Sequence, residues 1–384
     1  MRVFVPLEMD RNERRISVVP GTVSKLIKLG AQVEIEAGLG DSVFFSDAEY
    51  ESAGAIMAKD RTQGLAAADM VLRLRKPPMS ETSAMKPGCI HVSYLDPFND
   101  LHLLQALATG GSSAICMEMI PRSTIAQKMD ALSSQANLGG YVAVLMGANR
   151  LDRIFPMMST PSGTITPAKV FIIGVGVAGL QAIATAKRLG AVVEAFDTRP
   201  VVEEQVKSLG GKFVKVDLGE TGQTAQGYAR ELTPEQLDKQ RDVMAKHCAQ
   251  ADLVITTAQV FGRKAPVIVT TEMVQRMKPG SVVVDMAVET GGNVECSRLD
   301  EEVLVNQVRV LGHGNLPGRV PHVASEMYSN NLCNLVDHFW DRETKTFKLD
   351  PENEILKQCL VTHGGKVCHE GLQKLITSKT SSAS

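Results

Sequence analysis

The sequence has 384 residues, of which 44% are hydrophobic and 22% are charged, and its formal net charge is −2. This length exceeds one ordinary core, so we expect two domains. Interspersed acids and bases give no electrostatic reason to expect nucleic acid or an anionic membrane as a partner. The seven cysteines and eight histidines are scattered, which argues against a disulfide framework and against a metal site. No apolar run approaches the roughly 20 residues that cross a bilayer. Residues 1–6 are typical of a first strand and not of a signal peptide, so we expect a soluble, cytoplasmic protein.

Strands alternate with helices through the first third of the chain. Apolar residues at helical spacing predict a helix over residues 22–29 that ends at Gly30, a residue type common after the last helical turn. A second helix is predicted over residues 101–108. The predicted strands are residues 3–5, 32–36, 70–74, 90–94 and 113–117. Strands separated by helices of this length predict a parallel sheet covered on both faces.

The middle third repeats the pattern and predicts a second parallel sheet. Its strands are residues 169–173, 191–196, 253–257, 281–285 and 308–312, with helices over 179–189 and 271–277. The second helix stops at Lys278-Pro279-Gly280, a cation followed by two helix breakers. The last third contains one clear helix, residues 325–339, and a tail beyond residue 371 that we expect to fray.

A glycine-rich turn, Gly174-Val175-Gly176-Val177-Ala178-Gly179, follows the strand at 169–173 and opens a helix. Gly-x-Gly-x-x-Gly alone fits an ordinary strand-to-helix turn equally well, but the flanking strand and helix favour a dinucleotide site. Gly174 permits the tight turn, Gly176 lets the backbone approach a pyrophosphate, and Gly179 allows close packing of helix on sheet. The helix N-terminus supplies unpaired N–H groups to the phosphates.

Asp197 ends the next strand, 18 residues after Gly179. A carboxylate there accepts hydrogen bonds from the adenosine ribose and repels a 2′-phosphate. Arg199 nearby could pair with a 2′-phosphate instead, but Asp197 occupies the strand end itself. The sequence therefore predicts NAD(H) over NADP(H).

The fold class that these elements predict is α/β, with two Rossmann-like domains whose parallel sheets are separated by a cleft. We expect the first domain to comprise residues 1–137 and 318–384, and the second to comprise residues 138–317. The return of the chain to the first domain is a hypothesis that rests on the helix at 325–339, which follows the last strand of the second sheet.

Residues 118–137 carry polar groups suited to the nicotinamide end of such a cofactor. Interpreted as a loop entering a helix, the segment presents Arg122, then Gln127, Asp130 and Ser134 at helical spacings. The apolar face would be Met129, Leu132 and Ala136. A solvated face on an amphipathic helix fits this periodicity too. Against that alternative, Ser, Thr, Gln and Asp crowd the segment with almost no Lys or Glu, and amides and carboxylates suit a carboxamide and its ribose.

Three stretches resemble the proton-translocating nicotinamide nucleotide transhydrogenases. Residues 174–191, the glycine-rich turn and its helix, are similar to that family's signature. Residues 119–135 resemble its Arg-Gln-Asp loop, and Asp285-Met286-Ala287-Val288-Glu289 followed by Gly291-Gly292-Asn293 is a third match. The resemblance runs from Arg2 to about His369. The stop without membrane helices is similar to the separate NAD(H)-binding subunit of bacterial enzymes.

The resemblance implies direct hydride transfer from NADH to NADP+ held by a partner component, coupled to proton translocation. The implied partners are a membrane-spanning transhydrogenase subunit and an NADP(H)-binding component. The subunit is then expected to be a homodimer, peripheral on the inner face of the cytoplasmic membrane through those partners.

The resemblance also implies residue roles. Arg122, Gln127, Asp130 and Ser133 would hold the nicotinamide end as the catalytic set, and Asp197 would bind the ribose. Gly227 and Tyr228 would belong to a mobile lid, which the polar composition of residues 217–239 supports; a disordered excursion is the alternative. Gln259 departs from relatives that can carry an apolar residue there. The implied cofactor contacts are Arg122, Ser123, Thr124, Ile125, Gln127, Asp130, Ser133, Gly174, Gly176, Val177, Gly179, Asp197, Thr198, Arg199, Gly227, Tyr228, Gln240 and Gln259.

Alanine dehydrogenase is similar in architecture and is the alternative function. That family holds a 2-oxo acid with an Arg, a Lys and a catalytic His, and has an Asp near the nicotinamide. Here those positions are Arg15, Arg75, Asp96 and Glu289. A carboxylate at position 96 would repel pyruvate and carries protons poorly at pH 7. Hydride transfer between two nicotinamides needs no such group. A non-catalytic NAD-sensing module stays open as a third hypothesis.

Overall fold

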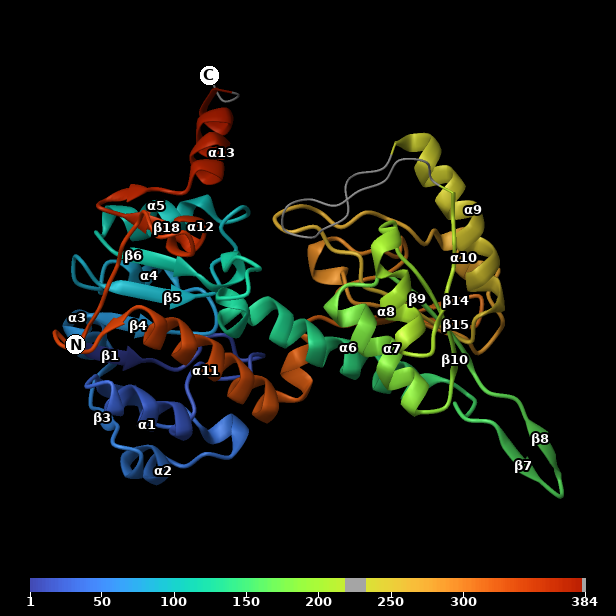
Figure 1. Ribbon diagram of the computed structural model, residues 1–384, viewed down its shortest axis with the longest axis horizontal. Helices are drawn as coiled ribbons and strands as arrows, with labels where there is room; N and C mark the ends of the chain where they lie inside the picture. Colours follow the sequence, from blue (N-terminus) through green and yellow to red (C-terminus); the bar gives the residue numbers. More distant parts are fainter. Residues whose placement is uncertain (218–232, 382–384) are drawn as a thin grey trace. The chain divides into compact units, whose positions relative to one another are not determined.

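The computed structural model describes residues 1–217 and 233–381. The chain divides into two compact units, Met1–Gln135 with Val320–Ser384, and Ala136–Arg319. The predicted domain boundaries lie after residue 137 and before residue 318, and the observed division falls inside α6 (Ala131–Arg150). Each unit holds one predominantly parallel sheet with helices packed on it (Figure 1), which confirms the predicted α/β class with Rossmann-like folds. The cleft stays a prediction.

The first unit is built on an eight-stranded sheet in the order β19-β18-β6-β5-β4-β1-β2-β3. Strands β1 to β6 run parallel, as predicted. The antiparallel edge formed by β18 and β19 was not predicted, because these short strands lack the strand–helix alternation that the interpretation relied on. The strands are β1 (Arg2–Val5), β2 (Gln32–Glu36), β3 (Ile56–Ala58), β4 (Met70–Leu72), β5 (Ile90–Ser93), β6 (Ser113–Cys116), β18 (Leu360–His363) and β19 (Lys366–Val367).

Side-chain alternation along β1 divides the core of this unit into two layers. Val3 and Val5 pack with α1 (Pro20–Lys28) and α11 (Pro321–His338), which lie on the same face of the sheet (Figure 1). Phe4 faces the opposite layer with Leu residues of α5. The remaining helices are α2 (Asp47–Ser52), α3 (Arg61–Ala67), α4 (Met79–Thr82), α5 (Leu101–Thr109), α12 (Leu356–Cys359) and α13 (Glu370–Ser381), and a small hairpin joins β16 (Trp340–Asp341) to β17 (Thr346–Phe347).

The prediction of a frayed tail beyond residue 371 is wrong. Residues 370–381 form α13, and Leu372 is completely buried against the second layer of the core. A single apolar anchor of this kind is easily overlooked in a segment that is otherwise rich in Ser, Thr and Lys.

The second unit holds a seven-stranded sheet in the order β11-β10-β9-β12-β13-β15-β14. All neighbours are parallel except β14, which pairs antiparallel with β15 at one edge. A separate hairpin, β7 and β8, projects from the rest of this unit (Figure 1). The strands are β7 (Met158–Thr160), β8 (Gly163–Ile165), β9 (Lys169–Ile173), β10 (Val192–Phe196), β11 (Lys212–Phe213), β12 (Leu253–Thr256), β13 (Val282–Asp285), β14 (Glu301–Val305) and β15 (Val308–Gly312).

Helix ends in the second unit follow local capping chemistry. The helices are α7 (Val177–Arg188), α8 (Glu203–Ser208), α9 (Pro234–Gln250) and α10 (Thr271–Gln275). Residues 234–239, predicted as part of a lid, are the first turns of α9. Thr233 and Gln236 form a capping box there and Pro234 occupies the first turn, so this helix start is encoded locally. The predicted lid residues Gly227 and Tyr228 lie outside the described residues.

His91 on β5 gives the first unit a sensitivity to acid. The side chain is completely buried, with Nε2 3.0 Å from Ser93 Oγ. Burial and the nearby Arg73 charge lower the pKa of His91 from 6.5 to about 3. The unfolded chain binds a proton near pH 6.5 that the folded chain refuses, so this residue removes stability as pH falls from 6.5 toward 3.

Replacing this residue, His91→Asn, is expected to remove that dependence. The difference in unfolding free energy between parent and variant should change by about 1.4 kcal/mol per pH unit between about pH 6 and pH 4. Urea denaturation across that range measures it. His338→Asn, at an exposed histidine of α11, is the control and should show a constant difference. A constant difference for His91→Asn as well would contradict the buried neutral histidine.

Candidate dinucleotide site and polar loop

The turn between β9 and α7 is closed against side chains at two of its glycines. Gly174 has φ +96°, and a Cβ there would lie 2.6 Å from Thr257 Oγ1. A Cβ on Gly179 would lie 2.0 Å from the Gly174 carbonyl oxygen. Thr257 Oγ1 donates a hydrogen bond to that same oxygen at 3.0 Å. The neighbouring strand end, β12, therefore fixes the turn, a role for Thr257 that the sequence did not reveal.

Gly176 differs from both, because its open side faces no protein. A Cβ built there meets no atom of the described residues within 4 Å, and the residue is exposed. Gly176 is also the N-cap of α7, where no side chain of the described residues accepts the first helical N–H groups. Uncapped N–H groups and the positive end of a 12-residue helix next to open space fit an anionic phosphate.

Asp197, directly after β10, is tied to the same turn. Its carboxylate accepts hydrogen bonds from the Val175 N–H at 2.7 Å and from the Arg199 N–H at 2.9 Å. Arg199 also makes a bidentate pair with it, at 2.8 Å from both Nε and Nη2. The hydrogen bonds that Arg199 donates to Asp197 raise the pKa of Arg199, and together with the carboxylate charge they outweigh the lowering effect of burial. The predicted ribose acid is thus at the predicted place, and its acceptor positions are shared with Arg199.

The polar loop of the first unit is not one helical face. Gln127 lies on the short 3-10 helix η3 (Ala126–Met129), and α6 begins only at Ala131. Asp130 stands between them with extended backbone, so Gln127 and Ser134 do not follow a single helical repeat. The helical interpretation is wrong here because Asp130 starts a new helix, as aspartate often does.

The loop residues nevertheless fall into two groups with different surroundings. Asp130 accepts from the Ser133 N–H at 2.9 Å and from Ser133 Oγ at 2.6 Å, and Arg122 Nε lies 3.9 Å from it. These three residues therefore meet around one carboxylate. Ser134 turns instead to Asn331 Oδ1 at 2.7 Å. The sequence thus offered both serines, and the structure joins Ser133 to the predicted set.

The exposed part of the loop holds the remaining predicted contacts. Ser123 Oγ accepts from the Ala126 N–H at 3.2 Å, and Ile125 is 64% exposed although apolar. Exposure of a large apolar side chain in an otherwise polar loop is compatible with a surface that another molecule covers. The predicted contacts Arg122, Ser123, Thr124, Ile125 and Gln127 are all exposed.

The other predicted contacts of the second unit lie near the ends of its strands and on α9. Val177 and Thr198 are half-buried. Gln259, after β12, is exposed and donates to the Met286 carbonyl at 3.0 Å. Gln240 on α9 is 4% exposed, so it is a core-facing residue of that helix.

The positions that would hold a 2-oxo acid are organised around Glu13, a residue that the sequence did not single out. Arg15 binds its carboxylate in bidentate fashion, at 2.8 and 2.7 Å. Arg75 Nε binds the same carboxylate at 2.7 Å. Asp96 is exposed, has φ +50° and accepts from Asn99 Nδ2 at 2.7 Å. The signal that could have indicated this network is Glu-x-Arg, but the partner Arg75 lies 62 residues away.

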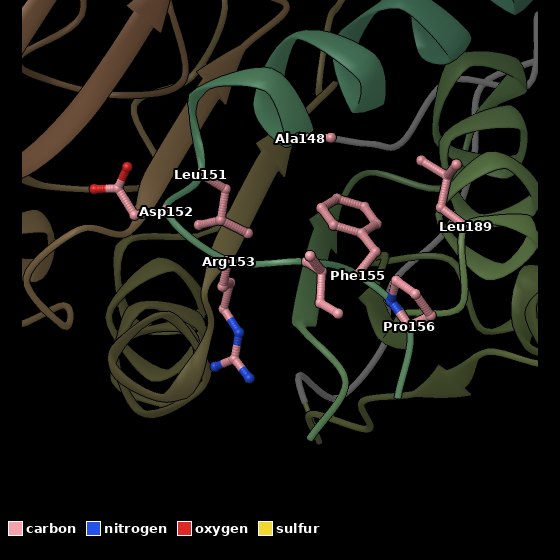
Figure 2. Close-up of a pocket in the computed structure, with 8 residues that line it drawn as sticks. Ala148, Leu151, Asp152, Arg153, Phe155, Pro156 and Leu189 are labelled. Carbon is pink, nitrogen blue, oxygen red and sulfur yellow. The ribbon is translucent and has the colours of Figure 1, made fainter. Parts of the chain in front are cut away.

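A cavity of about 630 Å³ in the second unit is separate from the glycine-rich turn. Its lining includes Phe155, Pro156 and Leu189, while Asp152 and Arg153 point away from Phe155 (Figure 2). Leu189 follows the last turn of α7, whereas Gly176 caps its first. The 12 residues of α7 span about 18 Å, so this cavity is not the phosphate site.

Comparison with known proteins agrees with this architecture. Residues 4–139 match the alanine dehydrogenase/PNT N-terminal domain, and residues 143–370 match the alanine dehydrogenase/PNT C-terminal domain. The chain belongs to the alanine dehydrogenase/PNT family.

Within this family the chain is a homologue of transhydrogenase α subunits. It is 42% identical to the first polypeptide of the two-piece NAD(P) transhydrogenase subunit alpha of Rhodospirillum rubrum, over 97% of this chain and 99% of the relative. The crystal structure of a transhydrogenase from Sinorhizobium meliloti is 43% identical and superposes with a TM-score of 0.86, covering 96% of this chain and 100% of that chain. Alanine dehydrogenase of Bacillus subtilis is 31% identical over 97% of this chain and 94% of the relative. Among the residues that the structure describes, no helix combines the length and apolar character needed to cross a membrane.

Proposed function

We propose that the chain is the NAD(H)-binding subunit of a proton-translocating transhydrogenase. It binds NADH, whose hydride passes directly to NADP+ on a partner component. The partners are that NADP(H)-binding component and a membrane-spanning subunit, and through them the chain sits on the inner face of the cytoplasmic membrane. We also propose that it is a homodimer. The relatives named NAD(P) transhydrogenase subunit alpha support this assignment.

The open face of Gly176 is the observation that carries the dinucleotide part of the proposal. A glycine whose Cβ would touch no protein atom of the described residues is explained by a ligand that needs the space. The uncapped start of α7 supplies N–H donors for a pyrophosphate, and Asp197 supplies the acceptor for a ribose. Together they support NAD(H) as the ligand of the second unit.

The polar loop supports a binding role in the first unit. Asp130 is 8% exposed and fixes Ser133 and the start of α6, so it forms a rigid base. Arg122 and Gln127 extend from that base as exposed side chains able to hold a carboxamide and its ribose. We propose that Arg122, Gln127, Asp130 and Ser133 hold the nicotinamide end.

The chemistry asked of the protein is positioning. The hydride donor and acceptor both belong to nucleotides, so no protein group must donate or accept a proton in the transfer. The chain's residues must orient one ring, hold it near a second ring at roughly 3–3.5 Å and keep water away. The exposed, uncharged amide of Gln127 suits orientation better than acid–base work.

Reconstitution tests the function. The chain is mixed with a purified NADP(H)-binding component, and NADH-dependent reduction of NADP+ is followed. Transfer that needs both proteins supports the proposal. Oxidation of NADH that requires pyruvate and ammonia without a partner would assign alanine dehydrogenase activity, which the paired Arg15 and Arg75 keep as the second candidate. NADH binding with no transfer in either assay would indicate a sensor.

Gln127→Asn is expected to slow hydride transfer about tenfold or more with little loss of NADH affinity, because a shortened amide misplaces the ring without removing the phosphate contacts. Single-turnover transfer and NADH titration separate the two quantities. Lys128→Gln, at the neighbouring exposed residue, is the control and should leave both unchanged. Unchanged transfer in Gln127→Asn would refute the role of Gln127.

A further inference from the structure

The carboxylate of Asp197 has no acceptor position left over. An ionised carboxylate offers about four lone-pair positions. Described residues fill four: the N–H groups of Val175 and Arg199, and Nε and Nη2 of the Arg199 side chain. The adenosine ribose carries two hydroxyls that need acceptors at this carboxylate. Two of the four present donors must therefore leave before a ribose can bind.

The two backbone donors cannot leave without unfolding the turn. Val175 belongs to the glycine-rich turn itself, and its N–H lies 2.7 Å from Asp197 Oδ2. The Arg199 N–H lies two residues from Asp197 and closes a local turn at 2.9 Å. The Arg199 guanidinium, by contrast, is at the end of a flexible side chain that is 15% exposed. It is the group able to move.

We propose that the Arg199 guanidinium is an internal competitor for the ribose site, which NAD(H) displaces from Asp197 when it binds. The inference rests on the proposed function of this site. The pair also sets the choice of nucleotide. With Arg199 bound, the charge of Asp197 is compensated and its repulsion of a 2′-phosphate is weakened, and the displaced guanidinium offers that phosphate a cation.

The competition has a measurable consequence. Arg199→Met removes the two competing donors and the positive charge but keeps most of the side-chain length. We expect NADH to bind about three- to tenfold more tightly, because charged hydrogen bonds need no longer be broken. We expect NADPH to bind more weakly, so the preference for NADH over NADPH rises by more than the NADH affinity does. Calorimetric titration of the purified chain with each nucleotide measures both.

Thermal unfolding separates competition from a structural role. Arg199 Nη2 also donates to the Val175 carbonyl at 3.1 Å, so Arg199→Met should lower the melting temperature without nucleotide. Competition then predicts a larger rise of the melting temperature on adding NADH than in the parent. A purely structural role predicts a smaller rise and weaker NADH binding. Arg188→Met, at an exposed arginine near the end of α7, is the matched control and should change neither.

Two further measurements keep the inference testable. Arg199→Lys retains the charge but cannot form the bidentate pair, so it should show NADH affinity between parent and Arg199→Met with a preference close to the parent's. In the parent, NMR of the Arg199 Nε–H should show loss of protection when NADH saturates the site, even if Arg199→Met fails to fold.

The outcomes distinguish this inference from the proposed function. A parent chain that does not bind NADH at all would overturn the proposed function. A parent that binds NADH while Arg199→Met binds it equally or less well, or whose Arg199 Nε–H stays protected at saturation, would overturn the competition alone.

Discussion

A Gly176→Ala chain is expected to fold as stably as the parent and to bind NADH on the order of a hundredfold more weakly. Gly176 has φ −84° and ψ −164°, extended backbone that alanine adopts without strain. Its Cβ would meet no protein atom of the described residues within 4 Å. The added methyl group would instead occupy the space through which a pyrophosphate approaches, displacing it from several charged hydrogen bonds worth about 1.5–3 kcal/mol each. Denaturant unfolding and NADH titration give the two quantities.

Gly179→Ala is the matched variant with the opposite signature. Its Cβ would lie 2.0 Å from the Gly174 carbonyl oxygen, a backbone atom that Thr257 also holds. The turn and the helix must move apart, which costs about 1–3 kcal/mol or more of unfolding free energy. NADH binding that persists at parental strength in Gly176→Ala would mean that no phosphate approaches the turn at this residue.

The elements around this turn were predictable because their signals are local. β9 is a continuous apolar run and α7 carries its apolar residues at helical spacing, so the observed bounds differ from the predicted ones by at most two residues. The role of Thr257 was not predictable in this way, because its hydrogen bond to Gly174 joins residues 83 positions apart and leaves no local trace.

The polar loop shows where local periodicity fails. Asp130 fits a helical repeat with Gln127 and Ser134, yet it ends one short helix and starts another. Aspartate three residues before Ser133 is an N-cap pattern, and weighing that signal above the periodicity would have placed the helix start correctly. The roles of the loop residues in nicotinamide binding stay predictions.

Long-range pairing explains the rest of what the sequence did not indicate. The edge strands β18 and β19 reach the first sheet from the C-terminal segment, and β18 pairs with β6. The Ala114 N–H of β6 donates to Thr362 Oγ1 of β18, 248 positions away. Arg199 was considered for a 2′-phosphate, but a salt bridge with a residue two positions away has no periodic signature. Neither feature is encoded in a spacing that can be recognised along one segment.

Glu13→Gln is expected to destabilise the first unit by about 3–5 kcal/mol, because it leaves a buried arginine without its counter-charge. The Glu13 side chain is fully buried and Arg15 is 4% exposed. Arg15 Nη1 also donates to Gln135 at 2.8 Å, and Gln135 donates to the Ala324 carbonyl at 3.0 Å. One carboxylate therefore anchors a hydrogen-bonded series that joins the N-terminal segment to α6 and α11.

The pH dependence of Glu13 gives an independent check of that magnitude. Burial alone would raise the pKa of Glu13, but the hydrogen bonds and charges of Arg15 and the charge of Arg75 outweigh it and lower the pKa from 4.5 to about 2. The stabilisation is therefore complete above pH 4.5 and is lost as pH falls toward 2. A shift of this size corresponds to about 3 kcal/mol, within the range expected for the variant.

Urea denaturation at neutral pH and below about pH 4 tests both statements, since Glu13→Gln should lose most stability at neutral pH and progressively less in acid. Glu352→Gln, whose partner Lys357 lies 3.7 Å away at the surface, is the control and should change stability little. The double variant Glu13→Met with Arg15→Met should be less destabilised than Glu13→Gln, because no unpaired charge is then buried. Equal losses in the double and single variants would mean that the hydrogen-bonded shape, and not the uncompensated charge of Arg15, is what the first unit requires.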